Sequence, residues 1–187
     1  MRKLAIALAF LGLMTLASPA SAGFIGFTVE FKYFFPNTSA QIQGPTNAVV
    51  GAGLEFPNLI GLGTGDFTDT TITVDWAGLA AVNGLFTSAV FNGPQFFDVF
   101  AAIPSFMSVT INPATTFAAF TASRLFFDAD TIRLNFESLQ PTVGQSVVVL
   151  DVSFAGQANP VPEPATLSLF GLGAAAVFAR RKRKATR

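Results

Sequence analysis

Hydrophobic and polar residues alternate with a period of two along several short segments of the chain. From position 25 to position 35 every odd residue is apolar or aromatic, whereas positions 26, 28, 30 and 32 carry Gly, Thr, Glu and Lys. The same period returns at 72–76, 107–111 and 132–136. It is typical of β-strands with one buried face. We therefore expect the following side chains to face the core: Ile25, Phe27, Val29, Phe31, Tyr33, Phe35, Ile72, Val74, Trp76, Met107, Val109, Ile111, Ile132, Leu134 and Phe136.

The rest of the middle of the chain also favours strands. The run "SVVVLDVSF" at 146–154 predicts a final, more deeply buried strand, and clusters of Gly, Pro, Asn and Asp separate the segments. Only 113–123 has a pattern that a short helix could adopt. Many short strands without intervening helices predict an all-β fold for residues 23–160, either a barrel or an antiparallel β-sandwich of jelly-roll-like or Greek-key type.

Charge is distributed unevenly along the chain. The 11 basic and 11 acidic residues balance, but residues 23–160 contain three bases and ten acids, which gives this part a net charge of −7. An acidic domain repels phosphate backbones, so we expect no nucleic-acid partner.

The first 22 residues have the pattern of a secretory signal peptide. Two basic residues precede an apolar stretch at 4–16, and Ala20 and Ala22 place small side chains where signal peptidase requires them. This predicts export through the Sec machinery and cleavage before Gly23. A membrane helix fits less well, because 4–16 is too short to span a bilayer. Since the chain has no Cys, its exported fold must depend on a hydrophobic core.

The C-terminal residues combine an extended Pro-Glu-Pro segment, an apolar run and a basic end. Residues 165–179 form a helix of about 22 Å if fully helical, which is short for a hydrocarbon core of about 30 Å. The positive-inside rule keeps the following basic cluster in the cytoplasm. The cluster is formed by Arg180, Arg181, Lys182, Arg183 and Lys184. A permanent single-pass anchor would explain the helix and the charges, but not the two prolines.

Residues 161–187 resemble the PEP-CTERM sorting signal of Gram-negative bacteria. The resemblance rests on the box Pro162, Glu163 and Pro164, followed in order by the apolar helix 165–179 and the basic tail 180–187. It implies that an exosortase removes the tail near the box. The protein would then be anchored only transiently in the inner membrane before it reaches the cell surface or an exopolysaccharide matrix.

Residue types limit the chemistry available to the middle of the chain. The absence of His and Cys excludes Ser-His-Asp and Cys-His catalysis and His-ligated zinc. Lys32, the only lysine between the two ends, follows Glu30 on the polar face of a strand, where a solvated ion pair is expected. Paired carboxylates remain formally possible, but no pair stands out among ten acids. We expect no catalytic residue, no cofactor and no enzymatic activity.

Two groups of residues are candidate binding sites. Asp128 and Asp130, with Asp66 and Asp69, offer the oxygen ligands that Ca²⁺ prefers, but ordinary turn chemistry explains them better. The aromatic pairs 34–35, 96–97 and 126–127 indicate either strands covered on both faces or an exposed apolar patch for self-association or a matrix partner.

Two functions follow from the sequence. The first is a non-enzymatic structural or adhesive protein of the envelope or matrix, associated with exopolysaccharide or biofilm. The second is a secreted polysaccharide-binding module or glycoside hydrolase delivered by the same tail. Exposed aromatic rings beside a groove, or two carboxylates across a cleft, would favour the second.

Overall fold

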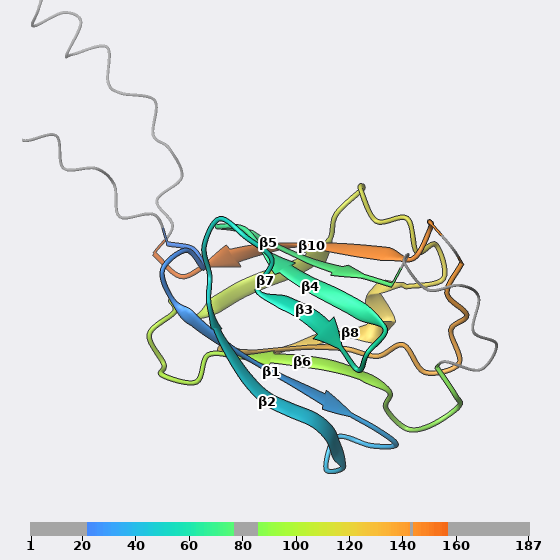
Figure 1. Ribbon diagram of the computed structural model, residues 1–187. Coiled ribbons are helices and arrows are strands. Elements are labelled where there is room, and N and C mark those ends of the chain that lie inside the picture. Colours follow the sequence, from blue (N-terminus) through green and yellow to red (C-terminus); the bar gives the residue numbers. More distant parts are fainter. Residues whose placement is uncertain (1–21, 77–85, 143, 157–187) are drawn as a thin grey trace, which may run out of the picture. The chain divides into compact units, whose positions relative to one another are not determined.

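The structure, a computed structural model, describes residues 22–76, 86–142 and 144–156, which form two antiparallel five-stranded sheets (Figure 1). The first sheet has the order β2 (Gln41–Val49), β1 (Thr28–Phe34), β6 (Gly93–Phe97), β9 (Thr131–Leu134) and β8 (Leu125–Phe127). The second has the order β3 (Phe56–Leu59), β4 (Gly63–Phe67), β5 (Thr71–Asp75), β10 (Val147–Phe154) and β7 (Phe106–Ile111). The prediction of an all-β fold is confirmed. Instead of a helix at 113–123, the described residues contain one 3₁₀ turn at Ala122–Arg124.

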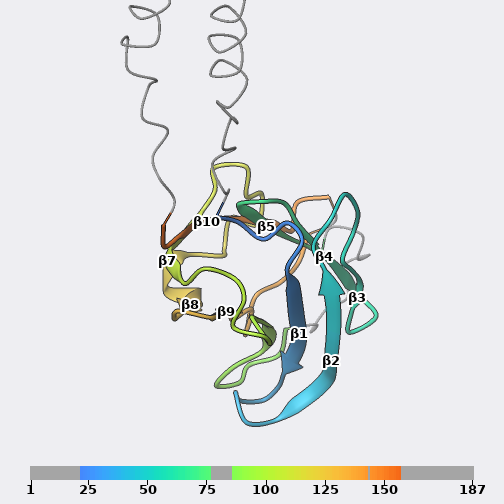
Figure 2. The ribbon, with the colours of Figure 1, turned by 90° about the vertical axis from the view of Figure 1, so that its left-hand side faces the viewer.

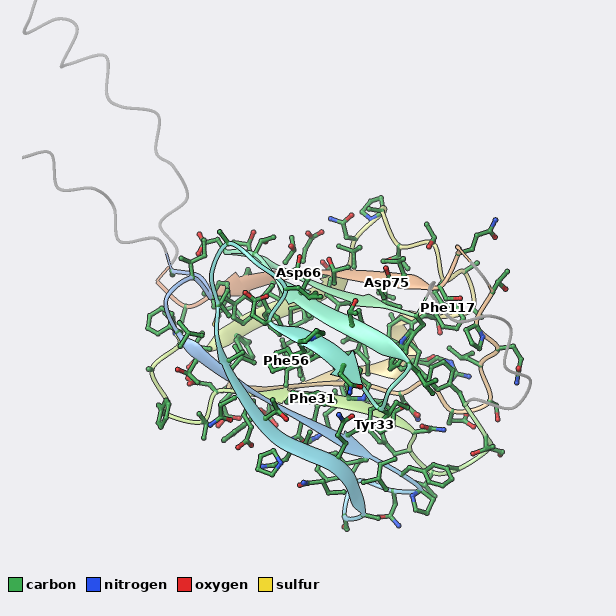
Figure 3. All side chains as sticks on the ribbon, in the orientation of Figure 1. Phe31, Tyr33, Phe56, Asp66, Asp75 and Phe117 are labelled. Atoms are coloured by element: carbon green, nitrogen blue, oxygen red, sulfur yellow. The ribbon has the colours of Figure 1, made fainter. Side chains whose placement is uncertain are left out.

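Side chains from both sheets meet in one buried cluster. Phe31 of the first sheet and Phe56 of the second have ring centroids 5.6 Å apart, and Phe96 and Phe67 are 5.1 Å apart. Figure 3 shows Phe31 and Phe56 among these inward-pointing side chains. Edge strands β2 and β3 lie on one side of the two sheets, and β7 and β8 lie on the other (Figure 2). Aromatic packing across the sheets supplies the core that a chain without cysteine requires.

Most predicted core positions are correct. The central residues of β1, the set Ile72, Val74 and Trp76, and the set Ile132, Leu134 and Phe136 are all buried. Phe27, Phe35 and Ile111 are only half-buried. Residues 147 and 149 of the final strand are also half-buried, so β10 is fully buried on one face only.

Two predicted core residues point outward. Ile25 is 58% exposed because it lies in a turn before β1, where Phe27 N donates to Phe24 O, and Phe24 enters the core in its place. Met107 is 65% exposed because the pairing of β7 with β10 shifts register, which turns Phe106 inward. In both cases a local irregularity interrupts the two-residue period.

The aromatic pairs behave differently from one another. Phe34 and Phe96 are buried, and the second member of each pair is half-buried. Phe126 and Phe127, on the short edge strand β8, are 49% and 44% exposed. Within the described residues, the aromatic pair with both members exposed is therefore at a sheet edge.

Residues 157–187 lie outside the described residues. The predicted helix 165–179 and the first 21 residues of the predicted signal peptide are also outside them. No helix in the part of the chain that the structure describes is long and apolar enough to cross a membrane.

Candidate functional site

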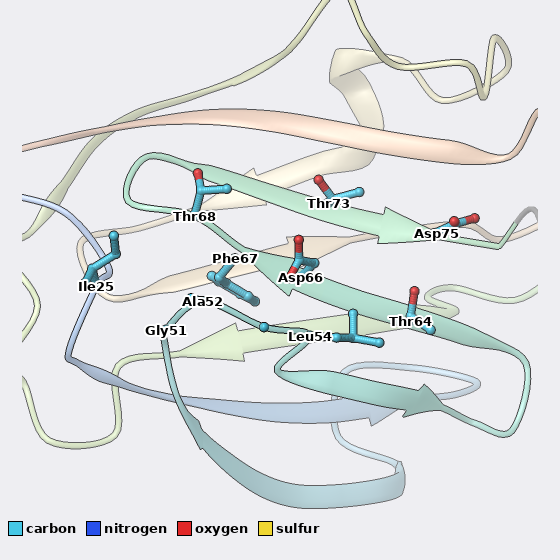
Figure 4. Close-up of a pocket in the computed structure, with 11 residues that line it drawn as sticks. Ile25, Gly51, Ala52, Leu54, Thr64, Asp66, Phe67, Thr68, Thr73 and Asp75 are labelled. Carbon is cyan, nitrogen blue, oxygen red and sulfur yellow. The ribbon is translucent and has the colours of Figure 1, made fainter.

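A shallow groove of about 730 Å³ crosses the outer face of the second sheet beside the loop 51–54 (Figure 4). Its floor consists of outward-facing side chains of β4 and β5, which are Thr64, Asp66, Thr73 and Asp75. These residues pair across the two strands, Thr64 with Asp75 and Asp66 with Thr73. The exposed apolar side chains of Ile25 and Leu54 lie at its rim.

The sequence "GTGDF" of β4 explains why this face is polar. The inward positions alternate with the outward ones, and two of the inward positions are glycines. A Cβ atom at Gly63 would lie 2.3 Å from the ring of Trp76, which fills the core there. Glycine is therefore required at position 63 on the inner face, while Thr64 and Asp66 point to the opposite face and line the groove.

Glu55, which directly precedes β3, interacts with residues that line the groove. Its carboxylate accepts hydrogen bonds from the backbone N–H groups of Gly51, at 2.9 Å, and Phe67, at 2.8 Å. Partial burial, together with the charge of Glu55 and a hydrogen bond to it, raises the pKa of the Asp66 carboxyl. The two carboxyl groups therefore lie within hydrogen-bond reach of each other, and the Asp66 carboxyl takes up a proton more readily than an ordinary aspartate.

This arrangement offers hydroxyl and carboxyl groups to a polar ligand. Among the described residues, Phe67 is the one aromatic residue that lines the groove, and at 2% exposed it offers no stacking platform. Sequence reasoning missed Glu55, because it lies 11 positions before Asp66 and no motif links them. The position of Glu55 between a glycine-rich loop and a strand is the one feature of the sequence that could have marked it as a candidate.

Asp128 and Asp130, the predicted calcium candidates, occupy the turn between β8 and β9. Asp128 Oδ1 accepts from the N–H groups of Thr131, at 2.9 Å, and Asp130, at 3.2 Å. Thr131 Oγ1 donates to Asp130 Oδ1 at 2.8 Å. Partial burial raises the pKa of the Asp128 carboxyl, but the hydrogen bonds from Asp130 and Thr131 outweigh it and hold that pKa below its usual value.

The structure does not bring the four aspartates together. Asp66 and Asp69 belong to the β4–β5 hairpin of the second sheet, whereas Asp128 and Asp130 belong to the first. The described residues contain no group of three or more acidic side chains placed to hold a metal ion.

The expected ion pair between Glu30 and Lys32 is present, with Lys32 Nζ 2.5 Å from Glu30 Oε1. The prediction that it is solvated is wrong for Glu30, which is 7% exposed. Since β1 lies between β2 and β6, neighbouring strands flank Glu30 on both sides, at Asn47 and Phe97. The pair therefore lies within the first sheet rather than at its edge.

At the predicted signal-peptide cleavage site, Ala22 packs partly against the core and Gly23 is buried. Ala20 and all the predicted residues of the tail lie outside the described residues. Those tail residues are the box Pro162, Glu163 and Pro164 and the basic cluster 180–184.

The match found with a known protein family concerns the tail. Residues 160–184 match the PEP-CTERM protein-sorting motif. No curated protein and no solved structure matches the chain.

Proposed function

We propose that this chain is a non-enzymatic structural or adhesive component of the cell surface or extracellular matrix. The premise of this proposal is that the chain is an exosortase-sorted exported protein with a PEP-CTERM motif at 160–184. The motif carries the proposal, because it directs the protein to the cell envelope. It gives no role to the β domain, so the domain's part in the proposal rests on its own residues.

Three features of the β domain support a structural role. Side chains from both sheets share one core, as expected of a β-sandwich, which is the arrangement we propose for residues 23–160. Phe126 and Phe127 are exposed at a sheet edge. The described residues contain no cysteine, so this fold does not need disulfide formation. A domain of this kind is suited to persist outside the cell.

The carboxyl groups of the groove favour a non-enzymatic role. Glycoside hydrolases keep their two carboxyl groups about 5 to 9.5 Å apart, so that substrate or water fits between them. Asp66 and Glu55 instead touch each other, and backbone N–H groups occupy both oxygens of Glu55. Neither group is placed as a separate acid and nucleophile.

We assign different roles to the parts of the tail. Pro162, Glu163 and Pro164 are recognised by the exosortase, while the helix 165–179 and the basic cluster present them at the membrane surface. Replacing the box by three alanines should leave insertion intact, because hydrophobicity and positive charge set membrane topology. The variant should therefore accumulate as an uncleaved, membrane-bound form, detectable by fractionation and intact mass.

Deletion of residues 180–187 is the matched control, because it leaves the box unchanged. It should weaken the stop signal and release unprocessed protein into the periplasm. A permanent anchor predicts another outcome. The wild type would then stay in the membrane at full length in a host that carries an exosortase, and the alanine change would alter nothing.

Polysaccharide binding is the second candidate function, and the groove is the observation that favours it. Hydroxyl and carboxyl groups from β4 and β5 alternate on its floor, which suits the hydroxyl groups of sugars. Affinity electrophoresis in gels that contain exopolysaccharide tests this function. Retardation that is lost in Asp75→Ala, but kept in Asp151→Ala outside the groove, would favour binding over a purely structural role.

A further inference from the structure

The first residues of the β domain are fixed against the turn between β4 and β5. Phe24 is 1% exposed, and its ring lies 5.1 Å from that of Phe67 and 4.9 Å from that of Phe154. Its N–H donates to Asp69 O at 2.9 Å. Ile25, which follows Phe24, and Thr68, which follows Phe67, both line the groove in Figure 4. The backbone at the predicted cleavage site is therefore part of the folded domain.

Gly23 approaches the side chain of Asp69 closely. A Cβ atom at Gly23 would lie 1.9 Å from Asp69 Oδ1 and 2.6 Å from Asp69 O. Because the backbone nitrogen of a residue lies about 2.5 Å from its Cβ position, the nitrogen of Gly23 is within about 4.5 Å of Asp69 Oδ1. The nitrogen of Gly23 therefore lies beside the carboxylate, at a distance whose upper bound is close to the limit of about 4 Å for an ion pair.

The charge of that nitrogen depends on processing. In the precursor it belongs to the neutral peptide bond between Ala22 and Gly23. After cleavage it is an α-ammonium group, whose ordinary pKa of about 8 keeps it positive at neutral pH. The change adds one positive charge to an acidic domain, next to a carboxylate that is already in place.

We infer that removal of the signal peptide creates an ion pair between the α-ammonium group of Gly23 and the carboxylate of Asp69. This pair fixes the new N-terminus to the β4–β5 turn and stabilises the mature domain more than the precursor. Because Gly23 is buried and Ala22 is partly buried, signal peptidase must cut before this segment closes on the core. The inference rests on the proposed export and on cleavage before Gly23.

Acylation of the terminal amine tests the ion pair on the full chain, secreted by a host with signal peptidase and an exosortase. Intact mass first establishes the terminus. An acylating reagent near neutral pH then reacts only with the deprotonated amine, which the ion pair disfavours. The N-terminal peptide, which is separated from the lysine-containing peptides, should be acylated about three to ten times faster in Asp69→Asn than in the wild type.

Asp66→Asn is the matched control, since it removes one negative charge from the same hairpin and should change the rate by less than about twofold. Gly23→Ala gives a second measurement. Signal peptidase reads the residues before the bond, so cleavage should persist, but the methyl group must displace Asp69. Acylation should become faster, and the melting temperature should fall by several degrees.

Equal acylation rates in the wild type and Asp69→Asn, with both proteins folded and beginning at Gly23, would overturn the inference. A mature terminus at another residue would overturn it too. Neither result affects the sorting proposal, which fails separately if the protein is not exported or keeps its tail.

Discussion

Two acidic segments, each beside a hairpin turn, have opposite electrostatic character. The "GDFTD" segment at 65–69 contains Asp66, whose pKa is raised, and the "DAD" segment at 128–130 contains Asp128, whose pKa is lowered. Asp66 meets another carboxyl group, Glu55, which already holds the nearby N–H groups. Asp128 receives the N–H groups of its own turn. Partial burial raises the pKa of both carboxyl groups, but at Asp128 the hydrogen bonds of its own turn outweigh burial, whereas at Asp66 the charge of Glu55 adds to it.

The difference also separates local from long-range structure. The partners of Asp128 are two and three residues away in sequence, so this turn forms wherever the local sequence is present. The partner of Asp66 is on a different segment, and the contact exists only when β3 and β4 are assembled. Asp128 therefore stabilises its own turn, whereas the contact of Asp66 with Glu55 costs free energy when the two strands pair.

The largest effect is expected from removing the acceptor of the second turn. Asp128→Ala leaves the N–H groups of Asp130 and Thr131 without their side-chain acceptor and should lower the free energy of unfolding by about 1 kcal/mol. Urea unfolding of the processed protein measures this change. Asp128→Asn, which keeps the accepting oxygen, should recover most of the loss. If the alanine and asparagine variants are equally stable, the hydrogen bonds contribute nothing.

These turns indicate which features the sequence could predict. The turn at Asp128 follows from Asp chemistry within a few residues, and the strands at 72–76 and 132–136 follow from their period. The burial of Ile25 and Met107 was predicted wrongly, because a turn and a register shift change the face without changing the local pattern. The proximity of Gly23 to Asp69 and of Glu55 to Asp66 depends on strand pairing, which the period does not encode.

A smaller change in the free energy of unfolding, of opposite sign, is expected when Asp66 is replaced. The raised pKa of Asp66 means that the folded state binds more protons than the unfolded state between the ordinary and the raised value. This contribution to stability is therefore lost as pH rises through that window. Asp66→Asn removes the repulsion with Glu55 and should stabilise the protein at neutral pH by a few tenths of a kcal/mol, because the site is partly solvated. The advantage should vanish in acid.

Glu55→Gln is the control for this prediction. It removes the same repulsion but also the charge that binds the N–H groups of Gly51 and Phe67, so it should be destabilising. Thermal unfolding of both variants from pH 3 to pH 7 distinguishes the two effects. A destabilising Asp66→Asn at neutral pH would mean that the ionised Asp66 has a favourable partner and that its contact with Glu55 does not govern its contribution to stability.

The smallest effect, no change at all, is expected when calcium is removed. Asp128 Oδ1 already accepts two backbone hydrogen bonds, and Asp130 Oδ1 accepts one from Thr131, so the turn is satisfied by groups of the chain itself. An ion that bound the native state alone would raise the melting temperature with its concentration. The melting temperature of the processed protein should therefore be the same in excess chelator and in millimolar Ca²⁺. The contrary result would be a melting temperature that rises on addition of Ca²⁺, with the rise kept in Asp66→Asn and abolished in Asp128→Asn. That result would assign an ion to the turn at 128–130. The lowered pKa of Asp128 would then favour binding of the ion as well as stability of the turn.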